Sequence, residues 1–254
     1  METIVIANQK GGIGKTTTSI NLANILDEMG YKVLLIDADQ QGNSTDTYQA
    51  TVEGTATLYD VLMGDHIPLK EAMQHTEAGD IVASDPLLRE ADAKLSSDPE
   101  GEYRMIMALE GLEGYDYVII DTAPALNWIL RNCLICANKV IIPITADRYG
   151  LQGLASLNEA IKAVKKRQNK ELDVAGLLLI KYNERTILGK EVAESLEKIA
   201  EDMDTKLFHS KIRESVKTRE SQALRMPLIK YAPYCTTALD YRELVEELGI
   251  HDKQ

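Results

Sequence analysis

The sequence predicts an α/β fold in which a doubly wound, mainly parallel sheet carries helices on both faces. Short apolar runs rich in β-branched residues alternate along the chain with longer segments of helical periodicity. Several of the short runs are apolar throughout, as strands buried on both faces are. Alternation of this kind implies right-handed crossovers between parallel strands. Ligands of such sheets bind at the carboxyl ends of the strands, so the residues that follow each strand are the first place to look for a site.

Each expected element follows from this pattern. The strands are expected at residues 3–7, 32–36, 80–83, 117–120, 139–144, 175–180 and 205–207. The helices are expected at residues 16–29, 86–95, 102–112, 126–137, 151–167, 189–202 and 236–248. Residues 41–75 are polar and rich in Gly and Thr, which indicates a loop region with one short helix. We expect a single domain over residues 1–254, with no additional DNA-binding segment before the first strand.

Composition narrows the class of protein. The chain has 254 residues and a net charge of −12, which favours solubility and gives no overall attraction to nucleic acid. Its three cysteines are an odd number without the spacing of a secreted disulfide framework, so a cytoplasmic location is expected. The first residues lack the pattern of an export signal, and no apolar run has the length of a membrane span. The final predicted helix has an acidic polar face, which favours packing on the domain over a membrane surface.

A glycine-rich loop lies between the first strand and the first helix, with the sequence KGGIGKTT at residues 10–17. Glycines let backbone N–H groups converge on phosphate oxygens, and the helix N-terminus adds the positive end of its dipole. We expect Lys15 to reach the β- and γ-phosphates of a nucleotide, the hydroxyl of Thr16 to bind Mg²⁺, and Thr17 to contact the α-phosphate. The predicted phosphate-binding set is Gly11, Gly12, Ile13, Gly14, Lys15, Thr16 and Thr17.

The loop departs from the common G-x-x-x-x-G-K-[ST] pattern in two ways. Gln9 stands at the first glycine position, and a second lysine, Lys10, lies inside the loop. A second cation beside the phosphates would stabilise the charge of a phosphoryl-transfer transition state, as an arginine finger does. The alternative is that Lys10 is a solvated loop lysine.

Carboxylates follow two of the predicted strands. Asp37 and Asp39 come after the second strand, and Asp121 follows the run that begins at Tyr117. One such carboxylate typically holds Mg²⁺ in P-loop enzymes, and Asp121 fits that Walker B position. Asp37 and Asp39 are two residues apart, so on extended chain they share a face and both could approach the site. The alternative for each is that it caps the following turn.

The phosphate loop resembles the deviant Walker A loop of the ParA/MinD family of ATPases. The resemblance implies that Lys10 crosses a dimer interface to the partner's nucleotide. It also implies that Asp39 positions or activates the attacking water and that Asp37 lies in the outer shell of Mg²⁺. The segment containing these aspartates is similar to the family's switch I, although Gln40 stands where the family usually has proline.

The resemblance extends to ParA-like partition ATPases over nearly the whole chain. It includes the stretch YDYVIID at residues 115–121 and the stretch IPI at residues 142–144. Two further segments resemble DNA-contacting segments of the family, and they assign Arg185, Arg213 and Lys217 to DNA. Positive charge gathers in this C-terminal third of an acidic chain, which favours non-specific phosphate contacts, whereas solvated helix charges are the alternative. Asn183 follows a strand on the edge where adenine would lie, so it is either an adenine reader or an ordinary turn asparagine.

The expected function is that of a weak ATPase which binds ATP and Mg²⁺, forms an ATP-dependent homodimer and binds DNA non-specifically. A ParB-like centromere-binding protein would stimulate hydrolysis and drive plasmid or chromosome partition, with the ATPase on the nucleoid. The rival hypotheses are a MinD-like positioning ATPase at a membrane surface, an iron–sulfur protein using Cys133 and Cys136, and a nucleotide-binding protein without turnover.

Overall fold

The centre of the molecule is an eight-stranded sheet with the order β3-β4-β2-β5-β1-β6-β7-β8. A computed structural model describes residues 1–64, 67–145, 153–182 and 187–253. Every pair of neighbouring strands is parallel except β3 and β4. The strands are β1 (Glu2–Ile6), β2 (Val33–Ala38), β3 (Met73–Thr76), β4 (Gly79–Val82), β5 (Tyr117–Thr122), β6 (Lys139–Thr145), β7 (Asp173–Tyr182) and β8 (Ile212–Arg213). This arrangement confirms the predicted fold class.

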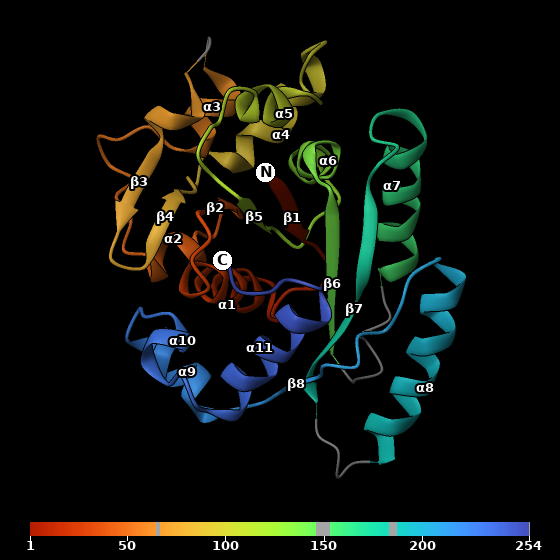
Figure 1. Cartoon of the computed structure of the whole chain (residues 1–254). Helices are drawn as coiled ribbons and strands as arrows, with labels where there is room; N and C mark the ends of the chain where they lie inside the picture. The colour runs from red at the N-terminus through yellow and green to blue at the C-terminus, as the bar shows by residue number, and fades with distance from the viewer. Residues whose placement is uncertain (65–66, 146–152, 183–186, 254) are drawn as a thin grey trace.

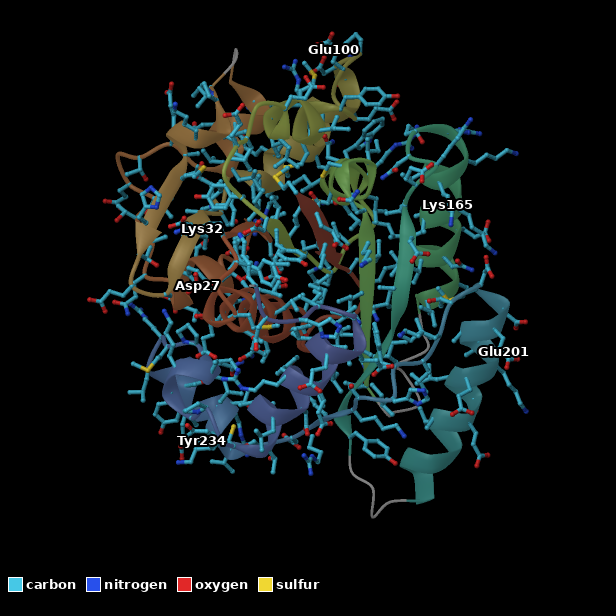
Figure 2. All side chains as sticks on the ribbon, viewed as in Figure 1. Asp27, Lys32, Glu100, Lys165, Glu201 and Tyr234 are labelled. Carbon is cyan, nitrogen blue, oxygen red and sulfur yellow. The ribbon has the colours of Figure 1, made fainter. Side chains whose placement is uncertain are left out.

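Helices cover both faces of the sheet (Figure 1). The apolar side chains of α1, α10 and α11 pack on one face, and those of α3 to α8 pack on the other. The helices are α1 (Lys15–Glu28), α2 (Asn43–Thr47), α3 (Leu58–Met63), α4 (Leu88–Ser97), α5 (Arg104–Leu109), α6 (Trp128–Cys136), α7 (Leu154–Arg167), α8 (Ile187–Asp202), α9 (Val216–Ala223), α10 (Leu228–Tyr231) and α11 (Thr236–Glu247), with a 3₁₀ turn at Leu69–Glu71. Charged side chains such as Asp27, Lys165 and Glu201 lie on the solvent side of their helices (Figure 2).

The strand sequences explain the two layers. In β1, Ile4 and Ile6 pack among the residues of α1, whereas Val5 packs into the opposite core. Side chains alternate between the faces of a strand, so a strand apolar at every position is buried on both sides. Burying a side chain such as Ile4 contributes about 2 kcal/mol to folding. The central strands are therefore rigid supports for the loops at their carboxyl ends.

Strand register brings the predicted acidic residues to one edge. Asp121 of β5 pairs with Ile6 of β1 on one side and with Asp37 of β2 on the other. Ile6 is the last residue of β1, so the glycine-rich loop begins beside both carboxylates. The topology alone thus places the loop and the two aspartates together.

The C-terminal helix packs on the domain, as its sequence predicts. Tyr241, Leu244 and Val245 of α11 are buried in the core that α1 also lines. On its polar side, the guanidinium of Arg242 lies 2.6 Å from the carboxylate of Glu28. Within the described ranges, no helix combines the length and apolarity needed to cross a membrane.

Parts of the sequence-based assignment are wrong. Residues 205–207 are not a strand, because only an isolated bridge joins Leu207 to Leu177. The edge strand is β8, whose two residues are too few to show a period. The region 41–75 contains most of β3 and three helical segments where one short helix was expected. Helices α9 and α10 were not predicted. Helix α9 buries only Ser221 and so has no apolar stripe, and α10 has four residues, which are too few to show a helical period.

Candidate functional site

The glycine-rich loop adopts a conformation that its glycines make possible. Gly12 has φ +71° and Gly14 has φ +78°, in the left-handed region that other residues rarely enter. A Cβ on Gly14 would also lie 2.8 Å from Cδ1 of Ile180 on β7. Gly14 is the N-cap of α1, so the loop runs directly into the helix N-terminus. Backbone N–H groups and the helix dipole therefore converge at one point, as an anion site requires.

Lys15 lies buried at the centre of this loop. Its side chain is 6% exposed, and its Nζ donates a hydrogen bond to the carbonyl of Lys10 at 3.1 Å. Burial lowers the pKa of Lys15, although the nearby charges of Asp121 and Asp39 act in the opposite direction. Burying the charged side chain of Lys15 costs free energy, because the ammonium loses its water. A buried lysine of this kind is suited to binding an anionic ligand.

The start of the loop is tied to β6. The amide of Asn8 donates to the carbonyl of Pro143 at 2.7 Å, and its Oδ1 accepts from the backbone N–H of Lys10 at 3.1 Å. Lys10 Nζ donates to the hydroxyl of Thr145 at 3.2 Å. Asn8 therefore fixes the path of the loop, and Lys10 has a hydrogen-bonding position within its own subunit.

Asp121 is fully buried near the end of β5, and its carboxylate accepts hydrogen bonds from several hydroxyl groups. The Ser44 hydroxyl donates to Oδ2 at 2.9 Å, and the Ser19 hydroxyl lies 3.2 Å from Oδ1. The Thr16 side chain also donates to this carboxylate. Burial raises the pKa of Asp121 to about 6, against the effect of the hydrogen bonds from Thr16 and Ser44 and of the charge of Lys15. Asp121 and Thr16 are thus joined before any ligand arrives.

Asp37 is also fully buried, and it holds the segment that follows β2. Its Oδ2 accepts from the backbone N–H of Thr45 at 2.8 Å and from the Thr45 hydroxyl at 2.7 Å. Its Oδ1 accepts from the backbone N–H of Asp39 at 3.2 Å. Burial and the charge of Asp121 raise the pKa of Asp37 to about 8. Asp37 therefore anchors α2 to the strand ends.

Asp39 has a more open position than the other two carboxylates. It is 6% exposed, and its Oδ1 accepts from the backbone N–H of Gln41 at 3.0 Å. The Ser84 hydroxyl donates to its backbone carbonyl. Unlike Asp37 and Asp121, Asp39 lines the cavity next to the loop. Of the three carboxylates, Asp39 is the one placed to meet a ligand or a water molecule there.

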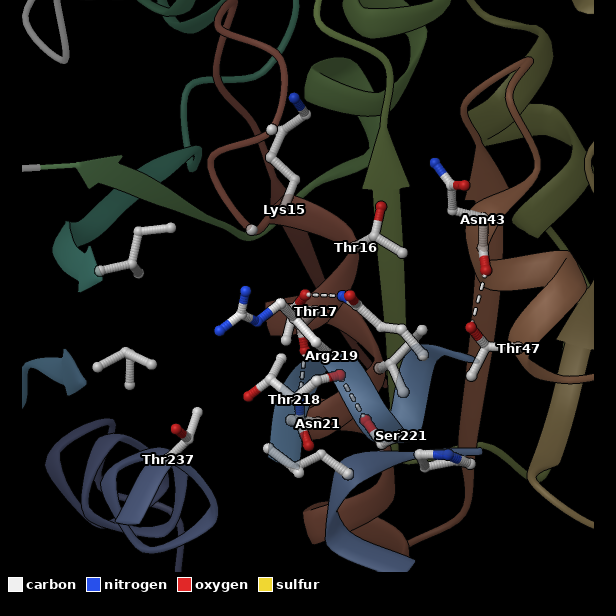
Figure 3. A pocket seen from close by; sticks show the side chains of 18 of the residues that line it. Lys15, Thr16, Thr17, Asn21, Asn43, Thr47, Thr218, Arg219, Ser221 and Thr237 are labelled. Carbon is white, nitrogen blue, oxygen red and sulfur yellow. Dashed lines mark hydrogen bonds between the residues drawn. The ribbon is translucent and has the colours of Figure 1, made fainter. Parts of the chain in front are cut away.

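The cavity has a volume of about 620 Å³, within the range of small-molecule sites. Its floor is the glycine-rich loop and the first turns of α1, and α9 to α11 form the opposite wall (Figure 3). Lys15, Thr16 and Thr17 line one part of it, while Thr218 and Arg219 of α9 line another. One cavity therefore joins the N-terminal loop to the C-terminal helices.

The oxygen atoms beside the loop suit a hard cation that would also be bound by phosphate oxygens. Asp121 and Thr16 supply oxygen atoms at the base of the loop, and oxygen is what Mg²⁺ prefers. Among the described residues, no group of three or more His, Cys, Asp or Glu side chains is arranged to hold a metal ion alone. Mg²⁺ usually keeps waters and substrate phosphates as ligands, so this arrangement fits it. When bound, the ion neutralises the charge of the phosphates.

Two of the predicted contacts lie outside the described residues, namely Asn183 and Arg185. Arg213 is bound within the fold, because its Nε lies 3.1 Å from the carboxylate of Asp240, which is 2% exposed. Lys217 is about half exposed and lies 2.8 Å from Glu220. The structure therefore gives Arg213 a folding role as well, whereas Lys217 is directed to the surface.

Sequence reasoning missed several polar residues of the site. Ser19 follows the loop by one helical turn, so its proximity to Asp121 could have been expected from helix geometry. Ser44 reaches Asp121 only because α2 folds back over the strand ends. Gln222 of α9 donates to the Thr17 hydroxyl at 3.2 Å across 205 positions, and no local pattern predicts such a contact. Lys181 likewise donates to the Gly12 carbonyl at 2.9 Å.

The site can be compared with known proteins. A family model described as an AAA domain matches residues 1–174. The chromosome partitioning protein ParA of Caulobacter vibrioides is 35% identical over 254 residues, covering 98% of this chain and 94% of that protein. The sporulation initiation inhibitor protein Soj of Bacillus subtilis is 36% identical over 251 residues, covering 97% of each. The chain belongs to the ParA/Soj family of P-loop ATPases.

Solved structures agree with the family. The McdA(D38A)–ATP complex of Cyanothece superposes with a TM-score of 0.88 at 26% identity, covering 100% of this chain and 98% of that one. Cobyrinic acid a,c-diamide synthase of Mycobacterium smegmatis, with bound ADP and magnesium, gives a TM-score of 0.83 at 28% identity, covering 97% and 93%. This ParA/Soj-family ATPase accordingly hydrolyses ATP and uses ATP with Mg²⁺, in keeping with the loop and carboxylates described above.

Proposed function

We propose that this ParA/Soj-family ATPase is a DNA-partition switch. ATP closes a homodimer, the dimer binds DNA without sequence preference, and a ParB-like partner stimulates hydrolysis and release. Partition-system relatives that match almost the whole chain support this proposal. A switch needs a long-lived ATP state, so slow intrinsic hydrolysis is expected.

The proposed coupling of nucleotide binding to DNA binding rests on the position of β8 and α9. The segment of β8 and α9 lines the nucleotide cavity through Arg213, Thr218 and Gln222. The same segment carries Lys217, which is about half exposed. A change at the phosphates thus has a short physical route to a cation at the surface. Nucleotide-dependent DNA binding is what such an arrangement would produce.

We assign the hydrolytic roles as follows. Lys15 and the amides of the loop bind the phosphates, and Thr16 with Asp121 holds the metal side of the site. Asp37 anchors the switch segment and sits next to Asp121 in the outer environment of the metal. Asp39 orients the attacking water, which its place in the cavity supports. Asp37 and Asp121 are fully buried, whereas Asp39 lines the cavity, so water in the cavity can reach Asp39.

The homodimer contact is assigned to Lys10. Within one subunit its Nζ donates to Thr145, so reaching a partner's nucleotide would require the side chain to leave that position. ATP in the partner would favour the exchange, because the ammonium of Lys10 would then meet an anionic phosphate oxygen in place of a neutral hydroxyl. Replacing Lys10 with Ala should leave ATP binding by the monomer intact and abolish the ATP-dependent dimer, measured by sedimentation velocity.

The DNA contacts are assigned to Arg185, Arg213 and Lys217. Lys217→Ala is the sharper test, because Arg213 also pairs with the buried Asp240 and its removal would disturb the fold. Each phosphate contact contributes about −0.9 to the slope of log affinity against log salt. Loss of Lys217 in both subunits should therefore reduce the slope by about 2. Lys170→Ala, a change of an exposed lysine beyond α7, is the matched control.

The deciding experiment measures duplex DNA affinity against salt with ATP, with ADP and without nucleotide. Binding that requires ATP, with the same affinity for unrelated sequences, is the expected result. Equal binding in all three states would contradict the proposal. The partner is tested by adding a cognate centromere-binding protein and measuring phosphate release, which should rise only when that protein and DNA are both present.

A further inference from the structure

A hydrogen bond links helix α9 to the first turn of helix α1, the helix that begins at the glycine-rich loop. Nε2 of Gln222 donates to the hydroxyl oxygen of Thr17 at 3.2 Å (Figure 3). Both residues line the same cavity. Thr17 is the second residue after Lys15, and its hydroxyl is the group assigned to the α-phosphate. Gln222 therefore contacts the very hydroxyl group that is assigned to bind the nucleotide.

In this hydrogen bond the Gln222 amide is the donor and the Thr17 hydroxyl is the acceptor. A threonine hydroxyl has one hydrogen to donate and lone pairs that accept. Because the Gln222 amide donates to Thr17, the hydroxyl proton stays available for a phosphate oxygen. A chain from amide to hydroxyl to phosphate is also cooperative, since each bond polarises the next. Phosphate binding and the Gln222 contact should therefore strengthen each other.

Helix α9 is held weakly enough to respond. Of its eight residues, all of them described, only Ser221 is buried. Within the described part of the chain, Thr218 Oγ1 on α9 and Asn21 Oδ1 on α1 are buried without a hydrogen-bond partner, and both residues line the cavity. Each unsatisfied atom costs about 1–3 kcal/mol. Elements with little buried apolar surface and unsatisfied contacts lie at the low-stability end of a fold.

The two sides of α9 face different surroundings. Thr218, Arg219 and Gln222 line the nucleotide cavity, whereas Lys217 points to solvent and lies 5.6 Å from the ring centre of Tyr231. A small rotation of α9 would move its cavity-lining residues and Lys217 together, because they belong to one helix. The inner face thus contacts the nucleotide site and the outer face carries the exposed cation.

We propose that Gln222 is a positioning residue which orients the Thr17 hydroxyl toward the α-phosphate and fastens α9 when ATP is bound. ATP thereby orders α9, and with it the outward face that carries Lys217. The part of the inference that concerns DNA rests on the proposed function. The part that concerns Thr17 and nucleotide affinity does not.

Two substitutions separate positioning from simple packing. Gln222→Ala removes the donor and should weaken ATP binding about 2- to 10-fold, the value of one hydrogen bond. Gln222→Glu keeps the shape of the side chain, but its carboxylate would accept a hydrogen bond from the Thr17 hydroxyl and add negative charge near the phosphates, so the loss of affinity should exceed that of Gln222→Ala. In a Thr17→Val background, Gln222→Ala should have no further effect. Gln49→Asn, which alters an amide that contacts the backbone of Arg225, is the matched control and should bind ATP normally.

The measurements are ATP affinity by calorimetry and amide hydrogen exchange of α9 with and without a non-hydrolysable ATP analogue with Mg²⁺. We expect the analogue to protect α9 in the wild-type protein and in Gln49→Asn, and not in Gln222→Ala. Wild-type affinity in Gln222→Glu, or equal protection of α9 in Gln222→Ala, would overturn the inference. DNA binding that is independent of ATP in the wild-type protein would contradict the proposed function alone, because the affinity ranking and the exchange data still decide the role of Gln222.

Discussion

Replacing Lys15 with Met should have opposite effects on the free protein and on its complex. Lys15 is 6% exposed, and within its own chain it donates to one backbone carbonyl. Burial lowers the pKa of Lys15 in spite of Asp121 and Asp39, so the folded protein disfavours the charged form. Met has a similar length and no charge to desolvate. We therefore expect the free energy of unfolding without nucleotide to rise, because the burial cost of the charge outweighs its attraction to Asp121 and Asp39.

The same substitution should abolish useful ATP binding. Charge-assisted hydrogen bonds contribute about 1.5–3 kcal/mol each, so losing the lysine weakens binding by at least about 3 kcal/mol if it contacts two phosphates, or roughly 100-fold. ATP at 100 times the dissociation constant stabilises the wild-type protein by about 2.7 kcal/mol, and this stabilisation should almost vanish in the variant.

The assay is thermal unfolding with and without ATP and Mg²⁺. A change of 1 kcal/mol corresponds to about 2–4 °C for a chain of this size. The variant should melt above the wild-type protein without nucleotide and below it with nucleotide, so the order reverses. Lys170→Met is the control for loss of an exposed lysine and should leave both transitions unchanged. A free variant less stable than the wild-type protein, or a variant that ATP still stabilises by 2–3 kcal/mol, would refute the reasoning.

Three further substitutions test the rest of the site. Asp39→Ala should bind ATP but hydrolyse it at least about 10-fold more slowly, measured by single-turnover phosphate release, because it removes the carboxylate assigned to orient the attacking water. Burial raises the pKa of Asp37 to about 8, so the fold favours its proton. The nucleotide-free protein should therefore lose stability as pH rises from about 4 to 8, and Asp37→Asn should flatten that decline in thermal unfolding against pH. Gly14→Ala forces φ +78° on alanine and a contact with Ile180, so it should lower the free energy of unfolding by about 1–2 kcal/mol or more in urea titrations.

Each of these predictions has a result that contradicts it. Normal single-turnover hydrolysis in Asp39→Ala would remove Asp39 from the catalytic role. A pH profile of Asp37→Asn that matches the wild-type profile would show that another group causes the decline. Gly11 meets no atom within 4 Å of an added Cβ, so Gly11→Ala is the control for Gly14→Ala and should lose less stability.

The sequence predicted the parts of the fold that buried strands determine. The central strands are apolar on both faces, and a register between parallel strands then brings Asp37 and Asp121 together without further information. The loop and its lysine were predictable because glycine conformation, helix start and phosphate geometry are all local requirements. Sequence and topology thus lead to the same edge of the sheet.

The remaining features depend on contacts between distant segments. β8 has two residues and α9 buries one side chain, so neither leaves a periodic signal. The bonds from Ser44 to Asp121 and from Gln222 to Thr17 exist only because the chain folds back over the sheet. Arg213 looked like a free cation in the sequence, whereas Asp240 binds it across 27 positions. Polar partners at long range are what a single sequence reveals least.

The most direct measurement is a crystal structure of this chain with a non-hydrolysable ATP analogue and Mg²⁺. The account predicts the triphosphate on the amides of the loop with Lys15 beside it, the metal between Thr16 and Asp121, and the nucleoside against the wall that α9 forms. A triphosphate bound away from residues 10–17, or a nucleoside that leaves α9 untouched, would contradict it.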